Sequence, residues 1–119
     1  MKRFVCLLLA AAVAAVLASA ALAHSGIEAT YPKRGATLAT PPAKVTITFE
    51  EEIRSGTVTV EGPSGAVVSK GSGGRDAANV ARLRVALKSG LGSGQYTVKW
   101  SIKAADGDAQ SGSFKFTVR

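Results

Sequence analysis

The sequence predicts an all-β domain, a seven-stranded β-sandwich or barrel with Greek-key connections, preceded by a cleaved signal peptide. Short runs in which apolar and polar residues alternate recur along the chain after residue 23. Gly, Pro, Ser and Asp separate these runs, and no segment there keeps a helical period. About seven short strands at close spacing are typical of a two-sheet sandwich.

The first 23 residues have the three parts of a secretory signal peptide. Lys2 and Arg3 are followed by an apolar run over 4–17, and small residues lead to Ala21-Leu22-Ala23. A positive start, a short apolar middle and an A-x-A end are the features of a cleaved leader. A membrane anchor is less favoured, because the run is Ala-rich and no second apolar span follows. We therefore expect residues 1–23 to be the signal peptide and residues 24–119 to be one domain.

The expected strands follow the alternation of side chains, because one face of each strand points to the core. An early strand is expected near 27–31, where Pro32 ends it. A short run at 66–68 follows the turn sequence Pro63-Ser64-Gly65. The other expected strands cover 45–49, 58–60, 83–87, 96–102 and 114–118.

The composition of the processed chain excludes several kinds of site. The only Cys and the only Met, Cys6 and Met1, lie in the leader. Disulfides, thiolate metal sites and a thioether site for cuprous copper are therefore excluded in residues 24–119. Loss of Lys2 and Arg3 leaves 13 basic and 8 acidic residues, a formal charge of +5.

Several cations fall on the outward phase of the expected strands: Arg82, Arg84, Lys99, Lys103 and Lys115. The favoured interpretation is that they keep the faces soluble and discourage edge pairing. A nucleic-acid or membrane patch is the alternative. It is less favoured because the charges are dispersed along the sequence and no aromatic residues accompany them in phase. Export also argues against a nucleic-acid partner.

His24 is the only histidine, and the expected cleavage makes it the first residue of the processed protein. Its freed α-amine and its imidazole Nδ1 can close a chelate ring on one metal ion. Both groups can lose a proton near neutral pH, since their ordinary pKa values are about 7.7–8.0 and about 6.5. Nitrogen and carboxylate ligands suit Cu(II). A histidine that follows the cleavage site by coincidence is the alternative.

Two groups of carboxylates could complete such a site. Asp106-Gly107-Asp108 lies between the expected strands at 96–102 and 114–118, where Asp and Gly are also ordinary turn residues. Glu50-Glu51-Glu52 ends the strand at 45–49. Three adjacent acids usually form a solvated strand end, but one of them could face a metal ion.

The order and spacing of these motifs resemble the CopC/PcoC-like periplasmic copper-resistance family. The similar segments are the leading His24, T-Y-P followed by G-A-T-L at 30–38, the V-T-I-T-F-E-E strand at 45–51, G-Q-Y-T-V-K-W at 94–100, A-D-G-D at 105–108 and S-G-S-F-K-F-T-V at 111–118. They extend over essentially the whole processed chain. The resemblance implies a cupredoxin-like or immunoglobulin-like β-sandwich that binds Cu(II) at its N-terminal end.

The resemblance also implies the ligands. His24 takes the position of the leading histidine, Asp106 that of the Asp in the family's D-G-H motif, and Glu51 that of a nearby Glu. Asp108 stands where the family has the second histidine, which is a departure from the pattern. A carboxylate is shorter than an imidazole, and oxygen-rich ligand sets are less selective for copper. We therefore expect weaker Cu(II) binding than in a two-histidine member.

Two functions remain open at this point. The first is an exported copper-binding protein of the periplasm that acts in copper homeostasis or resistance, as a monomer. It would pass Cu(II) to an inner-membrane transporter of the CopD type or sequester it. The second is an interaction module of the same fold that has lost the copper site. An oxidative enzyme acting on polysaccharide is disfavoured because the chain lacks a second histidine, and a Ser–His–Asp hydrolase lacks a free base.

Overall fold

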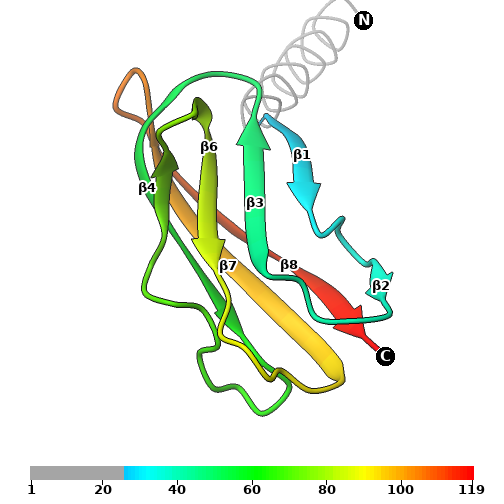
Figure 1. Cartoon of the computed structure of the whole chain (residues 1–119). Coiled ribbons are helices and arrows are strands. Elements are labelled where there is room, and N and C mark those ends of the chain that lie inside the picture. The colour runs from blue at the N-terminus through cyan, green and yellow to red at the C-terminus, as the bar shows by residue number, and fades with distance from the viewer. Residues whose placement is uncertain (1–25) are drawn as a thin grey trace, which may run out of the picture.

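A computed structural model describes residues 26–119 as an all-β domain (Figure 1). The signal peptide expected at 1–23 and the ligand expected at His24 lie outside the described residues. The strands are β1 (Ile27–Tyr31), β2 (Thr37–Leu38), β3 (Lys44–Phe49), β4 (Ile53–Glu61), β5 (Gly74–Asp76), β6 (Asn79–Ala86), β7 (Gly94–Ala104) and β8 (Ala109–Val118).

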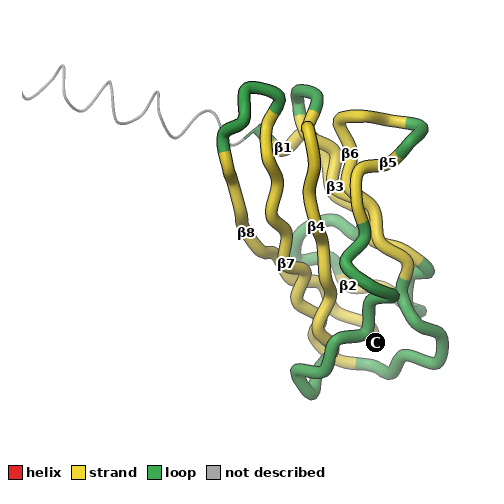
Figure 2. The backbone as a smooth tube through the Cα atoms, turned by 90° about the vertical axis from the view of Figure 1, so that its left-hand side faces the viewer, coloured by secondary structure: helices red, strands yellow, loops and turns green. Residues whose placement is uncertain are grey.

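The strands form two four-stranded sheets that pack face to face (Figure 2). One sheet has the order β1-β3-β6-β5 and the other β2-β8-β7-β4. Neighbouring strands are antiparallel, except for the short parallel pair of β2 and β8. β5–β6 and β7–β8 connect within a sheet, and every other connection crosses between the sheets. The predicted all-β sandwich is therefore confirmed, whereas the predicted number of seven strands is wrong.

The number of strands differs from the prediction at three short segments, β2, β5 and residues 66–68. Whether each of them forms a strand depends on pairing with distant parts of the chain. β2 and β5 are two and three residues long, too short to show alternation. The strand expected at 66–68 forms only an isolated bridge, between Val67 and Glu61. The chain there protects the open edge of β4, because Val68 N–H donates to Val60 O at 2.8 Å and Val58 N–H donates to Ser72 O at 2.8 Å.

The core lies between the sheets and is built by the predicted alternation. On β7, Tyr96, Val98, Trp100 and Ile102 are buried while the residues between them are more exposed. Tyr96 stacks on Phe116 of β8, with ring centroids 5.2 Å apart. The other buried apolar residues are Val45, Ile47, Phe49, Ile53, Val58, Val60, Leu83, Val85, Leu87, Phe114 and Val118.

Trp100 packs on a glycine of the neighbouring strand. Its partner in the register is Gly112 of β8, and a Cβ added there would stand 2.7 Å from Trp100 Cζ2. Phe49 meets the same indole edge-on, with the two ring centroids 5.3 Å apart. Within residues 26–119, the buried Nε1 of Trp100 has no hydrogen-bond acceptor. Gly112 therefore makes the space that the indole fills.

No helix in the described part of the chain is long and apolar enough to cross a membrane.

Candidate metal centre

The entry of the chain and three turns meet at one end of the sandwich, the upper end in Figure 1. The turns are residues 50–52, 77–78 and 105–108. All eight acidic residues of the chain lie within 26–119, and seven of them lie in these turns or in the strand ends beside them. We call this the acidic end; its acids are Glu28, Glu50, Glu51, Glu52, Asp76, Asp106 and Asp108.

The chain enters β1 against the first of these turns. Glu50 N–H donates to Gly26 O at 2.8 Å. Gly26 also lies against the Glu50 side chain, because a Cβ added to Gly26 would stand 2.7 Å from Glu50 Oε2. His24 is two positions before Gly26 in the sequence. The described chain thus begins at Gly26 beside the turn that carries Glu51.

A small open cleft of about 100 Å³ lies at this point. Its apolar floor is made by Phe49, Ile53 and Ile102, and the three glutamates of the turn stand at its rim. The cleft is far smaller than the roughly 300–1,000 Å³ of pockets that hold organic ligands. Its size fits an ion with a few water molecules, since each water takes about 30 Å³.

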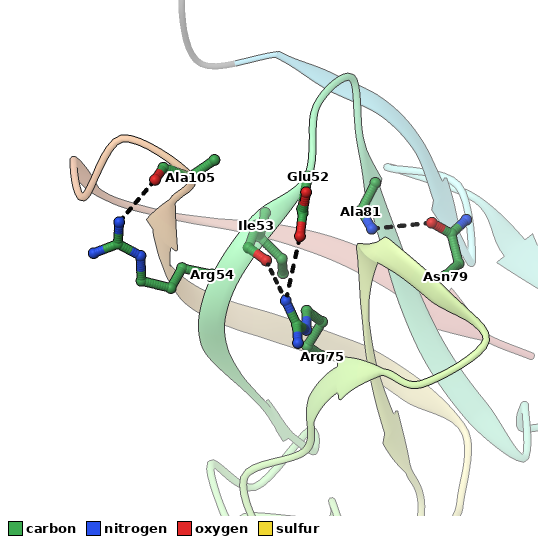
Figure 3. A network of polar contacts seen from close by, with 7 residues as sticks. All are labelled: Glu52, Ile53, Arg54, Arg75, Asn79, Ala81 and Ala105. Carbon is green, nitrogen blue, oxygen red and sulfur yellow. Dashed lines mark hydrogen bonds and ion pairs between the residues drawn. The ribbon is translucent and has the colours of Figure 1, made fainter.

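Only part of the glutamate turn has a partner within the fold (Figure 3). Arg75 Nη1 lies 3.7 Å from Glu52 Oε1 and donates to Ile53 O at 3.1 Å. Arg75 thereby ties β5 to the start of β4. Glu51 is exposed and forms no ion pair within residues 26–119. Glu51 is the glutamate of this turn that we predicted as a metal ligand from the family resemblance. It lines the cleft.

Asp106 and Asp108 form the β7–β8 turn. Asp108 N–H donates to Asp106 Oδ1 at 3.0 Å, and Ala104 N–H donates to Asp108 O at 2.7 Å. Gly107 has φ of 91°, which a glycine adopts without the strain of a side chain. One oxygen of Asp106 therefore shapes the turn, as an Asp does in many turns. Its other oxygen and the Asp108 carboxylate, both exposed, remain available to a cation.

Arg54 lies against this turn, a feature that sequence reasoning missed. Its Nη2 donates to Ala105 O at 2.9 Å (Figure 3). Its Nη1 stands 3.6 Å from the position of a Cβ added to Gly107. The β4–β7 register, which sets Ile53 beside Ala104, brings the guanidinium there. A fixed positive charge therefore stands next to two of the predicted metal ligands.

The described residues do not form a complete metal site by themselves. Within 26–119 there is no group of three or more Asp, Glu, His or Cys placed to hold one ion. Glu51 lines the cleft, whereas Asp106 and Asp108 are not among its lining residues. The fold brings all three to the acidic end on two separate turns, and His24 lies outside the described residues.

Asp76 is an acidic residue of this end that sequence reasoning did not single out. Ala78 N–H donates to its Oδ1 at 2.9 Å, and Arg82 Nη2 lies 3.0 Å from its Oδ2. The hydrogen bond from Ala78, assisted by Arg82 and Arg84, holds the pKa of the Asp76 carboxyl below its ordinary value although burial opposes this. Asp76 joins β5 to β6, and its charge is already partnered.

Comparisons with known proteins agree with this architecture. Among solved structures, CopC from Methylosinus trichosporium OB3b superposes with a TM-score of 0.65 at 23% identity, covering 78% of this chain and 91% of that one. PcoC, a methionine-rich copper resistance protein from Escherichia coli, has a TM-score of 0.62 at 22% identity, covering 79% of this chain and 97% of that one. Similarity at this level of identity shows a common fold.

The comparison with curated proteins found no match. The comparison with family models matched residues 27–119 to the CopC domain. That range contains all eight strands and both carboxylate turns. The chain therefore belongs to the CopC domain family.

Proposed function

We propose that this protein is an exported copper-binding protein that holds Cu(II) at its acidic end. The α-amine and imidazole of His24 supply two nitrogens, and Glu51, Asp106 and Asp108 supply oxygens. The observation that carries the proposal is the 2.8 Å hydrogen bond from Glu50 N–H to Gly26 O. It brings the segment that follows His24 to the turn of Glu51, at the end where seven of the eight acids gather.

The chemistry of the donors supports a weak copper site. Two nitrogens and several carboxylates are ligands that Cu(II) accepts in a tetragonal arrangement. Asp108 replaces an imidazole, which removes a nitrogen, and the Arg54 guanidinium beside Asp106 and Asp108 opposes a second cation. Both features lower the affinity that we expect relative to a two-histidine member. The function is binding rather than catalysis, since the proposed site offers a ligand set and no free base.

The family resemblance supports the rest of the proposal. The protein works in the periplasm after removal of residues 1–23, contributes to copper resistance or homeostasis, and remains a monomer. It delivers the ion to an inner-membrane copper transporter of the CopD type. The second candidate function is an interaction module that has lost copper, and the observation that favours it is the Arg54 contact with the β7–β8 turn.

Copper titration of the processed protein tests the proposal. Protein whose N-terminal His24 is verified by mass should bind one Cu(II) per chain, with nitrogen hyperfine structure in its EPR spectrum. A matched protein with a single extra residue before His24 should bind much more weakly, because its α-amine is displaced from the imidazole. Equal affinities of the two proteins would exclude the His24 chelate and leave the interaction module.

A substitution in the β7–β8 turn tests the other part of the site. Asp108→His should tighten Cu(II) binding and add a nitrogen to the EPR signature if this turn reaches the same ion as His24. An unchanged affinity and spectrum would remove Asp106 and Asp108 from the ligand set while leaving the His24 chelate in place.

A further inference from the structure

Four cations gather on the outer face of the β1-β3-β6-β5 sheet, away from the acidic end. We call Lys44, Lys70, Arg84 and Lys88 the basic patch; all four are exposed. Lys44 pairs with Ala86 in the β3–β6 register, and Lys70 N–H donates to Ala86 O at 2.8 Å from the other side. Strand alternation places Arg84 and Lys88 on the same face as Ala86. The four cations therefore surround one small residue.

The spacing within the basic patch is short. Adjacent strands lie about 4.8 Å apart, so the Cα atoms of Lys44 and Lys70 are separated by about 10 Å. Arg84 and Lys88 are four residues apart on an extended chain, a separation of about 13 Å. Both distances are close to the Debye length of about 10 Å at 0.1 M salt, so the four charges act on one another and on a partner together.

The cations of the patch lack the carboxylate partners that other cations of the fold have; Lys88 Nζ donates to the backbone Val67 O at 3.5 Å. Arg75 lies 3.7 Å from Glu52, and Arg82 lies 3.0 Å from Asp76. Within the described range, none of the four patch residues forms an ion pair. Arg84, at the upper margin of the patch, acts on Asp76 at a distance and helps to lower the pKa of that carboxyl. The three lysines have no carboxylate of this kind beside them.

Protection of a sheet edge does not explain this arrangement. Lys44 is on β3 and Arg84 is on β6, which are the two interior strands of their sheet. Lys44 lies diagonally to Arg84 across the β3–β6 pair, within reach of long side chains, so these two like charges repel one another. Solubility alone needs charges that are spread over the surface. The basic patch is therefore a local cost to the free protein that an anionic partner would relieve.

The shape of this face indicates an extended partner. The four cations are spread over about 10–13 Å around Ala86, a span that is wider than one small anion. An open groove beside the patch carries Lys70 and Lys88 together with the exposed Pro41 and the partly exposed Leu91. Cations bordered by apolar side chains are the features of surfaces that rest on membranes. We propose that the basic patch docks the protein on an anionic phospholipid surface.

Vesicle co-sedimentation tests this proposal. Phosphatidylcholine vesicles that contain one-third phosphatidylglycerol should bind the processed protein, whereas vesicles of phosphatidylcholine alone should not. Each cation near an anionic surface strengthens binding about fivefold. The triple substitution Lys44→Gln, Lys70→Gln, Lys88→Gln should therefore weaken binding about a hundredfold. Raising the salt from about 0.1 M to about 1 M shortens the Debye length from roughly 10 to 3 Å and should release the wild-type protein.

The matched control removes the same net charge from the other sheet and its end, with Lys103→Gln, Lys115→Gln and Arg119→Gln. These cations are exposed and form no ion pair within residues 26–119, and all three proteins begin at His24, so any contribution of residues 24 and 25 cancels. The control should bind within a few fold of wild type. Equal losses in the two triple variants would overturn the proposal, because net charge alone would then explain binding. It would also be overturned if the patch variant abolished self-association of the protein without vesicles, since the partner would then be the acidic end of a second copy.

Discussion

Gly112→Ala is expected to have two opposite effects on the stability of the domain. It restricts the unfolded chain, which stabilises the fold, and it adds a Cβ against Trp100, which destabilises it. Glycine within a strand costs about 0.5–1 kcal/mol relative to alanine through its greater freedom in the unfolded chain. On that ground alone the substitution would stabilise the domain. The added Cβ, however, would stand 2.7 Å from Trp100 Cζ2, 2.9 Å from Cε2 and 3.2 Å from Nε1.

The indole has little space to retreat. Trp100 is 7% exposed, and Phe49 meets its ring edge-on at a centroid separation of 5.3 Å. All three close atoms belong to one rigid ring, so the sheet or the ring must shift as a whole. Overpacking of this kind costs about 1–3 kcal/mol. Subtracting the gain at glycine leaves, at the middle of these two ranges, a destabilisation of about 1 kcal/mol.

Thermal unfolding followed by the fluorescence of Trp100, the only tryptophan, measures this difference. For a domain of this size, the expected loss corresponds to a fall in Tm of roughly 4–8 °C. Gly74→Ala is the control, since Gly74 also lies in a strand and a Cβ there would meet nothing within 4 Å. That variant should be as stable as wild type or more so. A Gly112→Ala protein with an unchanged or raised Tm would refute the packing argument.

Two further predictions concern charges at the acidic end. Asp76→Asn keeps an acceptor for Ala78 but removes the charge that Arg82 meets, so it should be less stable than wild type at pH 7. Because the pKa of Asp76 is lowered in the fold, this advantage of wild type is complete above its ordinary pKa of 3.8 and is lost as the pH falls toward the lowered value. Urea unfolding at a series of pH values should show the two proteins converging in acid, and a constant gap would contradict the argument. Arg54→Gln removes the cation beside the β7–β8 turn, and should raise Cu(II) affinity about two- to fivefold while changing stability by less than about 1 kcal/mol. An unchanged affinity in copper titration would show that this turn is outside the site.

Residue periodicity predicted most of the fold because one face of each of the long strands β3, β4, β6, β7 and β8 is buried. β3, β7 and β8 alternate over six or more residues, and their inward positions are the core residues expected from the sequence. β2 and β5 could not be predicted in this way, because two or three residues carry no period and their pairing depends on distant strands. The segment 66–68 has strand-like composition, yet its hydrogen bonds go to the edge of β4 instead of forming a new strand.

The candidate site could be predicted only in part for the same reason. Glu51, Asp106 and Asp108 follow predicted strands in the sequence. They could therefore be placed at an end of the sandwich, since the turns between antiparallel strands gather there. The position of Arg54 depends on the β4–β7 register, which no local pattern encodes. The cations also looked dispersed along the sequence. In the fold, Lys44 pairs with one side of Ala86 and Lys70 with the other side. Lys44 and Lys70 thereby come close together although they are far apart in the chain.

The acidic end divides its carboxylates between two tasks, and that division decides what His24 contributes. Asp76 is bound by Arg82, Glu52 lies beside Arg75, and one oxygen of Asp106 holds its own turn. Glu51, Asp108 and the other oxygen of Asp106 remain as the free oxygen donors of the proposed ligand set.

Oxygen donors alone favour hard cations such as Ca²⁺ and Mg²⁺, and do not select copper. In the proposed site, the nitrogens of His24 would therefore be the part that confers preference for Cu(II), while the turns would adjust its strength. It follows that a protein extended before His24 should lose its preference for Cu(II) over Ca²⁺ along with its affinity. Loss of affinity with an intact preference would place the selective donors in the turns instead.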